Sequence, residues 1–406
     1  MSTELSETEK RLIKVIADQN GFTDYQVEAQ PGAQKGDNYF GIITSVSLKD
    51  KNKSLELICK SAHSGEVFRE KMPIHEQYVR EIHLYESVLS EFKKFQEEYA
   101  VPNPFVGFPK FYGKYIDENN ECFFLENLKK SGYTHWDRKL PMNSEHIKAV
   151  LAEYAKFHAT SLAMRQLKPE MFKNLTENIK THVFEKPDRN ENDEMGNMFM
   201  TTAIKNALEI VGDNSSLIEA VRRAESGLIE DFASEDPSYD IVVTHGDCWC
   251  NNILFKYEDE TNTSKPTKVC FIDWQLTKVG SPAMDVLYFF FLHSPKDILC
   301  DYETYLKFYY EVLCRYLRDF SCDPEDLFPF STLQKHWKKF VNLQLLMSIM
   351  MLKTMLCDSE EALDLEKMTE DSDNIFDTHN FTIKNESEYH RRVRDIIESL
   401  METGLL

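Results

Sequence analysis

The sequence has little of what usually marks dinucleotide binding, cross-linking or membrane insertion. Only 14 of its 406 residues are glycine, and they never form a G-x-G-x-x-G loop, which excludes the common dinucleotide-binding fingerprint. Its nine cysteines are odd in number and irregularly spaced, so we expect reduced, buried thiols and no disulfide framework. The longest strongly apolar run, residues 286–292, is too short to cross a bilayer.

Basic residues are also scarce relative to acidic ones. The 47 lysines and arginines stand against 68 acidic residues, which gives a net charge of −21. Such a surface repels phosphate backbones and anionic lipid headgroups, so we expect no nucleic-acid partner and no membrane association. Residues 1–11 are polar and charged and do not resemble a secretory signal. We therefore expect a cytoplasmic protein that acts as a monomer.

The apolar content is sufficient for a large folded core. Hydrophobic residues make up 42% of the chain and aromatic residues 12%, as in ordinary globular proteins. A chain of 406 residues is long enough for one large domain or for two lobes.

The apolar periodicity predicts an α+β protein with two unequal lobes. The small β-rich N-lobe, residues 1–128, has predicted helices at 5–20 and 74–98 and predicted strands at 26–28, 39–48, 55–60 and 121–126. The larger C-lobe, residues 129–406, is mainly helical, with predicted helices at 144–166, 200–233, 283–293, 302–320, 331–357 and 386–402.

Two short buried-strand patterns each lead to a carboxylate. Residues 241–243 precede Asp247, residues 269–272 precede Asp273, and Asn252 follows Asp247 by five positions. Phosphoryl transfer needs one carboxylate that orients the acceptor hydroxyl and takes its proton, and an Asn and a second Asp that hold Mg²⁺ on the nucleotide phosphates. The spacing agrees with the kinase catalytic loop, H-x-D followed after four residues by N, and its later metal-binding Asp.

These motifs resemble the ecdysteroid kinase-like family of insects. That family belongs to a larger set with a protein-kinase-like fold, which includes aminoglycoside phosphotransferases and choline kinases. The matching segments occur in the expected order along the chain: residues 36–39, 78–85, 125–128, 155–159, 245–253, 271–275 and 282–285. The catalytic segments are specific, whereas the N-lobe matches are informative only as an ordered set.

The resemblance implies roles for the residues of the catalytic segments. Asp247 is the expected proton acceptor, and Asn252 and Asp273 are the expected Mg²⁺ ligands, since this hard cation prefers oxygen. His245 is expected beside them as a brace, through hydrogen bonds to the backbone or to Asp273. Gly246 stands where protein kinases carry Arg, which favours a small-molecule kinase over a protein kinase.

The N-lobe is expected to bind the phosphates of ATP. Lys60 ends an apolar strand and Glu81 lies on the following helix; an ion pair between them would position Lys60 on the α- and β-phosphates. Glu76 is a rival partner for Lys60. Gly36 and Asn38 can donate hydrogen bonds to phosphate, although a plain turn would contain the same residues.

The resemblance also implies a hinge for the adenine ring. The backbone of residues 126–128 would form hydrogen bonds with adenine, which assigns Glu126 and Leu128 to the nucleotide site. Backbone contacts leave no side-chain signature, so this assignment depends on position alone. Asp285 is expected to anchor the catalytic loop.

The expected function is an ATP- and Mg²⁺-dependent small-molecule kinase that phosphorylates an alcohol, an ecdysteroid hydroxyl by resemblance. One alternative is a detoxification kinase for xenobiotic or dietary alcohols. Another is a catalytically inactive ligand-binding protein on the same fold. The irregular glycine loop favours that last alternative, and the presence of Lys60, Glu81, Asp247, Asn252 and Asp273 argues against it.

Overall fold

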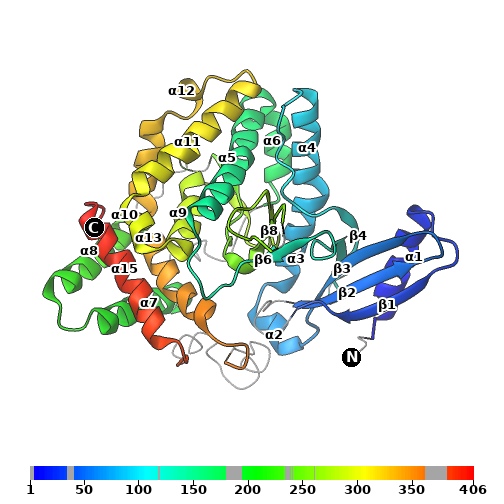
Figure 1. Cartoon of the computed structure of the whole chain (residues 1–406), viewed down its shortest axis with the longest axis horizontal. Helices are drawn as coiled ribbons and strands as arrows, with labels where there is room; N and C mark the ends of the chain where they lie inside the picture. Colours follow the sequence, from blue (N-terminus) through cyan, green and yellow to red (C-terminus); the bar gives the residue numbers. More distant parts are fainter. Residues whose placement is uncertain are drawn as a thin grey trace.

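A computed structural model of the chain describes residues 4–33, 41–117, 119–179, 194–233, 239, 241–259, 261–361 and 382–406. Figure 1 shows a β-rich part at one end of the molecule and a larger helical part at the other. Gly36 and Asn38 lie outside the described residues.

The β-rich part is built on a five-stranded antiparallel sheet in the order β1-β2-β3-β5-β4. Its strands are β1 (Gln26–Pro31), β2 (Gly41–Lys49), β3 (Ser54–Ala62), β4 (Phe111–Tyr115) and β5 (Cys122–Glu126). Side chains alternate between the two faces of such a sheet. In β3, Leu57 and Cys59 therefore face a small apolar core, whereas Lys60 points to the opposite face.

Helix α1 (Glu7–Gln19) covers the small core. Its Ile13 and Ile16 are buried there together with Leu57 and Phe124 of the sheet. The helix begins with a capping box, in which Ser6 accepts from the backbone N–H of Glu9 and the Glu9 carboxylate accepts from the N–H of Ser6. One face of the sheet is thus occupied by α1, and only the other face is available for the chemistry of Lys60.

A helical stretch leads from β3 towards the helical part of the molecule. It comprises α2 (Glu66–Lys71), α3 (Ile74–His83), the π-helical turn η1 (Leu84–Val88) and α4 (Leu89–Glu98). The buried residues Tyr78 and Ile82 of α3 join the main core. Glu81 of the same helix is also buried, which requires a charged partner.

The helical part contains most of the main core. Its helices are α5 (Ser144–Leu167), α6 (Pro169–Thr176), α7 (Glu194–Val211), α8 (Ser215–Ala233), α9 (Pro282–His293), α10 (Lys296–Cys300), α11 (Tyr302–Asp319), α12 (Pro324–Leu327), α13 (Phe330–Leu356) and α15 (Glu386–Glu402). Helix α5 packs against α11, and α9 packs against α13. Helix α9 is buried on all sides, so it is a rigid support for whatever touches it.

The C-terminal part also contains short strands. Strand β7 (Val242–Thr244) pairs with β10 (Lys278–Gly280), and β6 (Tyr133–His135), β8 (Ile253–Lys256) and β9 (Lys268–Phe271) form a second small sheet. A single 3₁₀ turn, η3 (Cys250–Asn252), leads directly into β8. These strands hold both ends of the loop that contains Asp247.

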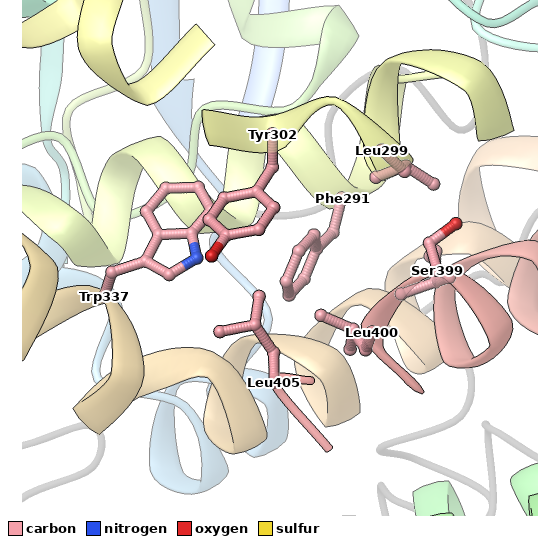
Figure 2. A pocket seen from close by; sticks show the side chains of 8 residues that line it. Phe291, Leu299, Tyr302, Trp337, Ser399, Leu400 and Leu405 are labelled. Carbon is pink, nitrogen blue, oxygen red and sulfur yellow. The ribbon is translucent and has the colours of Figure 1, made fainter. Parts of the chain in front are cut away.

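The core of the helical part is well filled. Figure 2 shows a hollow between α9, α13 and α15, lined by Phe291, Trp337 and Leu400 among others. Its volume of about 10 Å³ is roughly that of one water molecule, so it is a gap in packing. Among the described residues, the helical stretch Pro324–Leu356 is long and apolar enough to cross a membrane, but 61% of its most apolar window is buried inside the molecule, as in a core helix.

The predicted fold class is confirmed: a β-sheet N-terminal part precedes a mostly helical C-terminal part. The predicted long helix 74–98 is interrupted by one π-helical turn. Three strands, β4, β6 and β10, do not stand out in the sequence, because two of them have only three residues and β4 follows a region rich in proline and glycine. All nine cysteines carry free thiols, and eight of them are buried.

Candidate active site

A cavity of about 360 Å³ lies where the five-stranded sheet meets the helical part. Residues from β2, β3, α3, the segment after β5 and the loop before β8 contribute to its wall. It brings together predicted site residues that are far apart in sequence: Lys60, Glu81, Glu126, Leu128, Asn252 and Asp273. The volume suits a small molecule the size of a nucleotide.

The loop with the H-G-D motif is fixed by α9. Asp285 accepts hydrogen bonds from the backbone N–H groups of His245 (2.7 Å) and Gly246 (2.9 Å). The same carboxylate lies 3.2 Å from Nε2 of the buried His158. Since Asp285 is itself buried, these partners are what makes its charge tolerable. The expectation that Asp285 anchors the loop agrees with this geometry.

His245 braces the loop through the backbone. Its Nε2 donates to the carbonyl of Ile272 at 3.0 Å, and its Nδ1 accepts from the N–H of Asp247 at 3.3 Å. Burial lowers the pKa of His245, which favours the neutral ring that this pair of bonds requires. Both ring nitrogens are therefore engaged, and the imidazole links the loop that contains Asp247 to the residue that follows β9.

Gly246 is required by the backbone. It adopts φ +85°, and a Cβ there would lie 2.2 Å from the carbonyl oxygen of Leu276. No larger residue fits this position without a shift of the backbone. The glycine that the sequence shows in place of the protein-kinase Arg thus has a packing reason as well.

Asp247 is surrounded by hydrogen-bond donors. Asn252 donates through Nδ2 to the backbone carbonyl of Asp247 at 2.8 Å and to its carboxylate Oδ2 at 3.3 Å. Tyr288 of α9 donates to Oδ1 at 3.1 Å. Burial, and next the charge of Asp273, raise the pKa of Asp247, while the two donors favour the ionised form. The two donors, one at each oxygen, therefore hold the carboxylate in one orientation.

Asn252 directly precedes β8, and Asp273 lies just beyond the end of β9. Strands β8 and β9 pair Ile253 with Phe271, and Ile272 donates its N–H to the carbonyl of Asn252 at 3.0 Å. Both side chains face the cavity. Asp273 also has φ +64°, a strained conformation for a residue other than glycine that is typical of functional sites.

These two residues fit a hard divalent cation. Nδ2 of Asn252 is used by Asp247, which leaves its Oδ1 for the cavity, and Oδ1 of Asp273 is used by Lys60, which leaves its Oδ2. Neither remaining oxygen has a hydrogen-bond partner in the described part of the chain. One carboxylate and one amide oxygen, completed by phosphate oxygens and water, form a set that suits Mg²⁺.

Lys60 joins the two parts of the molecule. Its ammonium lies 2.7 Å from Oε2 of Glu81 and 2.8 Å from Oδ1 of Asp273. Burial pulls the pKa of Lys60 down, but the two carboxylates outweigh it and the net pKa is raised, so the cation persists. The rival partner, Glu76, is exposed on the other side of α3. Glu81 is thus the residue that orients Lys60.

The predicted hinge contains an unused donor. Asn127 is held in place by its N–H to the carbonyl of Glu56 and by its side chain to Ser45. Leu128 accepts from Tyr133 at 3.0 Å through its carbonyl, whereas its own N–H has no acceptor within the described ranges. Because buried backbone donors are nearly always paired, this N–H on the cavity wall fits a ring nitrogen such as that of adenine.

The phosphate-loop assignment remains a prediction. Gly36 and Asn38 lie outside the described residues, and only the start of the segment, Gly32 and Ala33, lines the cavity. Gly32 donates its N–H to the carbonyl of Ile43 at 2.8 Å, which keeps the end of β1 against β2.

Several residues of the cavity wall were not predicted from the sequence. His135, the last residue of β6, and the following Trp136, Asp137 and Arg138 line the cavity together with Asn251. Nothing in the local sequence marks residues 135–138, because the short β6 that brings them to the cavity has no periodic signal. Tyr288 was also missed: it lies in a continuous apolar run that reads as ordinary core.

The chain matches one protein family over most of its length. The sequence model of the ecdysteroid kinase-like family matches residues 35–322, well over half of the chain, and this span includes Lys60, Glu81, Asp247, Asn252 and Asp273. The chain belongs to the ecdysteroid kinase-like family. As a member of this family, it is a small-molecule kinase, that is, a phosphotransferase.

The comparisons with curated proteins and with solved structures are less informative. A search among curated proteins gives no significant match. Among solved structures, the chain is similar to a crystal structure from Haemophilus somnus 129PT described as a candidate fructosamine-3-kinase. The two share 12% sequence identity, the alignment covers 82% of this chain and 96% of the other, and the superposition is loose, with a TM-score of 0.34.

Proposed function

We propose that this ecdysteroid kinase-like protein transfers the γ-phosphoryl group of ATP, in the presence of Mg²⁺, to a hydroxyl group of an ecdysteroid. The observation that carries the phosphotransferase part is the ion-pair network of Lys60, which contacts Glu81 of the N-lobe at 2.7 Å and Asp273 of the C-lobe at 2.8 Å. The ecdysteroid acceptor rests on the family relationship.

In this proposal the predicted site residues in the cavity have separate roles. Leu128 and the hinge backbone hold adenine, Lys60 neutralises the α- and β-phosphates, and Asn252 and Asp273 hold Mg²⁺. The cation, when bound, neutralises charge on the transferring phosphoryl group. Catalysis then depends mainly on position and charge, since the chain supplies no covalent intermediate.

Asp247 acts on the acceptor alcohol. Its carboxylate orients the alcohol and takes the hydroxyl proton while the alcohol oxygen bonds to the γ-phosphorus and the bond to the β-phosphate oxygen breaks. The products are ADP and a phosphate monoester. Asp285 and His245 do not touch the reactants in this scheme; they keep the loop backbone in place.

The test is product analysis by mass spectrometry. The protein is incubated with Mg²⁺-ATP and a panel of 20-hydroxyecdysone, other sterols, choline and plant alcohols, with the Asp247→Asn variant as control. A phosphorylated ecdysteroid that is missing in the control supports the proposal. A phosphorylated non-steroid overturns the ecdysteroid assignment and favours detoxification. Bound ATP with no product from any acceptor or from water favours an inactive binding protein.

A further inference from the structure

Tyr288 contacts Asp247, the proposed proton acceptor, but lies outside the cavity. Its hydroxyl donates to Oδ1 of Asp247 at 3.1 Å, and its side chain is 5% exposed. Tyr288 does not line the nucleotide cavity. Among the described residues it is the one side chain that donates to this oxygen of Asp247, and no local sequence motif predicts the contact.

The support for this contact comes from a single rigid helix. Asp285 and Tyr288 are three residues apart on α9, so they project from the same face. Asp285 fixes the backbone of the H-G-D segment, and Tyr288 fixes the carboxylate that follows. Helix α9 is in turn held by Ser281, which caps its first turn and bonds to His336 of α13 at 2.8 Å. Backbone and side chain of the loop are thus positioned together.

The two oxygens of Asp247 have different surroundings. Oδ1 faces the buried hydroxyl of Tyr288, whereas Oδ2 faces Asn252, a residue of the cavity wall, at the longer distance of 3.3 Å. A carboxylate can rotate about its Cβ–Cγ bond unless its oxygens are held. The bond from Tyr288 fixes this rotation and occupies Oδ1, which leaves Oδ2 on the side of Asn252.

We propose that Tyr288 is a positioning residue for phosphoryl transfer, which holds Asp247 so that Oδ2 accepts the proton of the acceptor hydroxyl. The inference rests on the proposed function. In the step itself, the alcohol proton moves to Oδ2, the alcohol oxygen bonds to the γ-phosphorus, and ADP leaves. Tyr288 keeps its own proton throughout, and burial raises the pKa of its phenol.

The test compares Tyr288→Phe with a matched variant, Tyr305→Phe. Tyr305 is also a buried tyrosine of the helical part, and its hydroxyl donates to Ser144 at 2.9 Å, away from the cavity. Tyr288→Phe is expected to lower kcat by roughly 10- to 100-fold, the loss typical of one hydrogen bond to a charged group. The KM for ATP should stay unchanged, and Tyr305→Phe should keep the wild-type kcat.

Two acceptors separate this inference from the proposed function. Rates are measured with 20-hydroxyecdysone and with water, as slow Mg²⁺-ATP hydrolysis, because water must also lose a proton to Asp247. A wild-type protein inactive with both contradicts the proposed function itself. An active wild-type protein with an equally active Tyr288→Phe variant overturns only the role of Tyr288.

A double-mutant comparison shows whether Tyr288 acts through Asp247. If it does, adding Tyr288→Phe to Asp247→Ala should leave the residual rate unchanged, since there is no carboxylate left to position. A further loss in the double variant, or a Tyr288→Phe variant that loses thermal stability and ATP affinity together with kcat, would mean that the tyrosine is merely structural.

Discussion

The two sides of the cavity are built in different ways. On the side of the sheet, one charged residue, Lys60, reaches the cavity from β3 and depends on one helical partner, Glu81. On the opposite side, the segment with Asp247 and Asn252 is held by a buried helix, by a histidine with both ring nitrogens engaged and by the ends of paired strands.

The difference reflects what each side must do. Phosphate binding needs a positive charge at an approximate place, which a single lysine can supply as a compact point charge. Proton transfer needs a heavy-atom distance near 3 Å and a fixed orientation, so errors of about 1 Å are costly there. More interactions therefore hold the functional side chains on the side of Asp247 than on the side of Lys60.

Asp247→Asn should impair turnover without weakening nucleotide binding. We expect turnover to fall by about 1,000-fold, in the range of general-base catalysis, because the amide cannot accept the proton. Nucleotide affinity should stay close to the wild-type value, since Asp247 is not part of the cavity wall. Steady-state rates and ATP titration by calorimetry measure the two effects, and a wild-type rate would show that Asp247 is misassigned.

Asp273→Ala should affect both sides, because Asp273 contacts Lys60 and faces the cavity. We expect the affinity for ATP in Mg²⁺ to fall by roughly 100-fold, about 3 kcal/mol, and the difference between Mg²⁺ and EDTA to disappear. Asp259→Ala, at an exposed turn between β8 and β9, is the control. An unchanged Mg²⁺ effect in Asp273→Ala would exclude its role as a metal ligand.

Glu81→Gln should weaken the nucleotide side more gently. Lys60 keeps Asp273 as a partner, so we expect only a rise of roughly 10-fold in the KM for ATP, about the value of one charged hydrogen bond. Glu76→Gln removes the same charge from an exposed position of the same helix. Steady-state kinetics of the two variants should differ; equal values would mean that the Lys60–Glu81 pair does not position the nucleotide.

The smallest effect concerns the stability of the helical part at low pH. Burial lowers the pKa of His146 to about 4, while an unfolded histidine titrates near ~6.5. Between these values the unfolded chain binds more protons, so the contribution of His146 is complete above pH ~6.5 and is lost as the pH falls towards 4.

Urea unfolding at several pH values tests this expectation. Each such group adds at most about 1.4 kcal/mol per pH unit to the slope of the unfolding free energy. His146→Gln should reduce the slope between pH 6.5 and 4. An identical slope in this variant would show that His146 is charged in the folded protein.

The two sides of the cavity differ in how much of each could be predicted from the sequence. Asp247 and Asn252 are separated by five residues and flanked by apolar strands, so their proximity follows from local chain geometry and could be predicted. The pairing of Lys60 with Asp273 joins residues 213 positions apart, and it was not predicted from the sequence. The choice of Glu81 over Glu76 depended on which face of α3 is buried.

By itself, the sequence determined the two-lobed α+β organisation and predicted the proton acceptor and the metal ligands, because periodicity and short-range spacing are local properties. The supporting roles of His245 and Asp285 were also expected from the sequence, but the tertiary structure alone decided the others. Tyr288 reaches the catalytic segment because α9 packs beneath it, and residues 135–138 reach the cavity because β6 pairs with β8. Such contacts depend on packing between distant elements, and no local pattern encodes that packing.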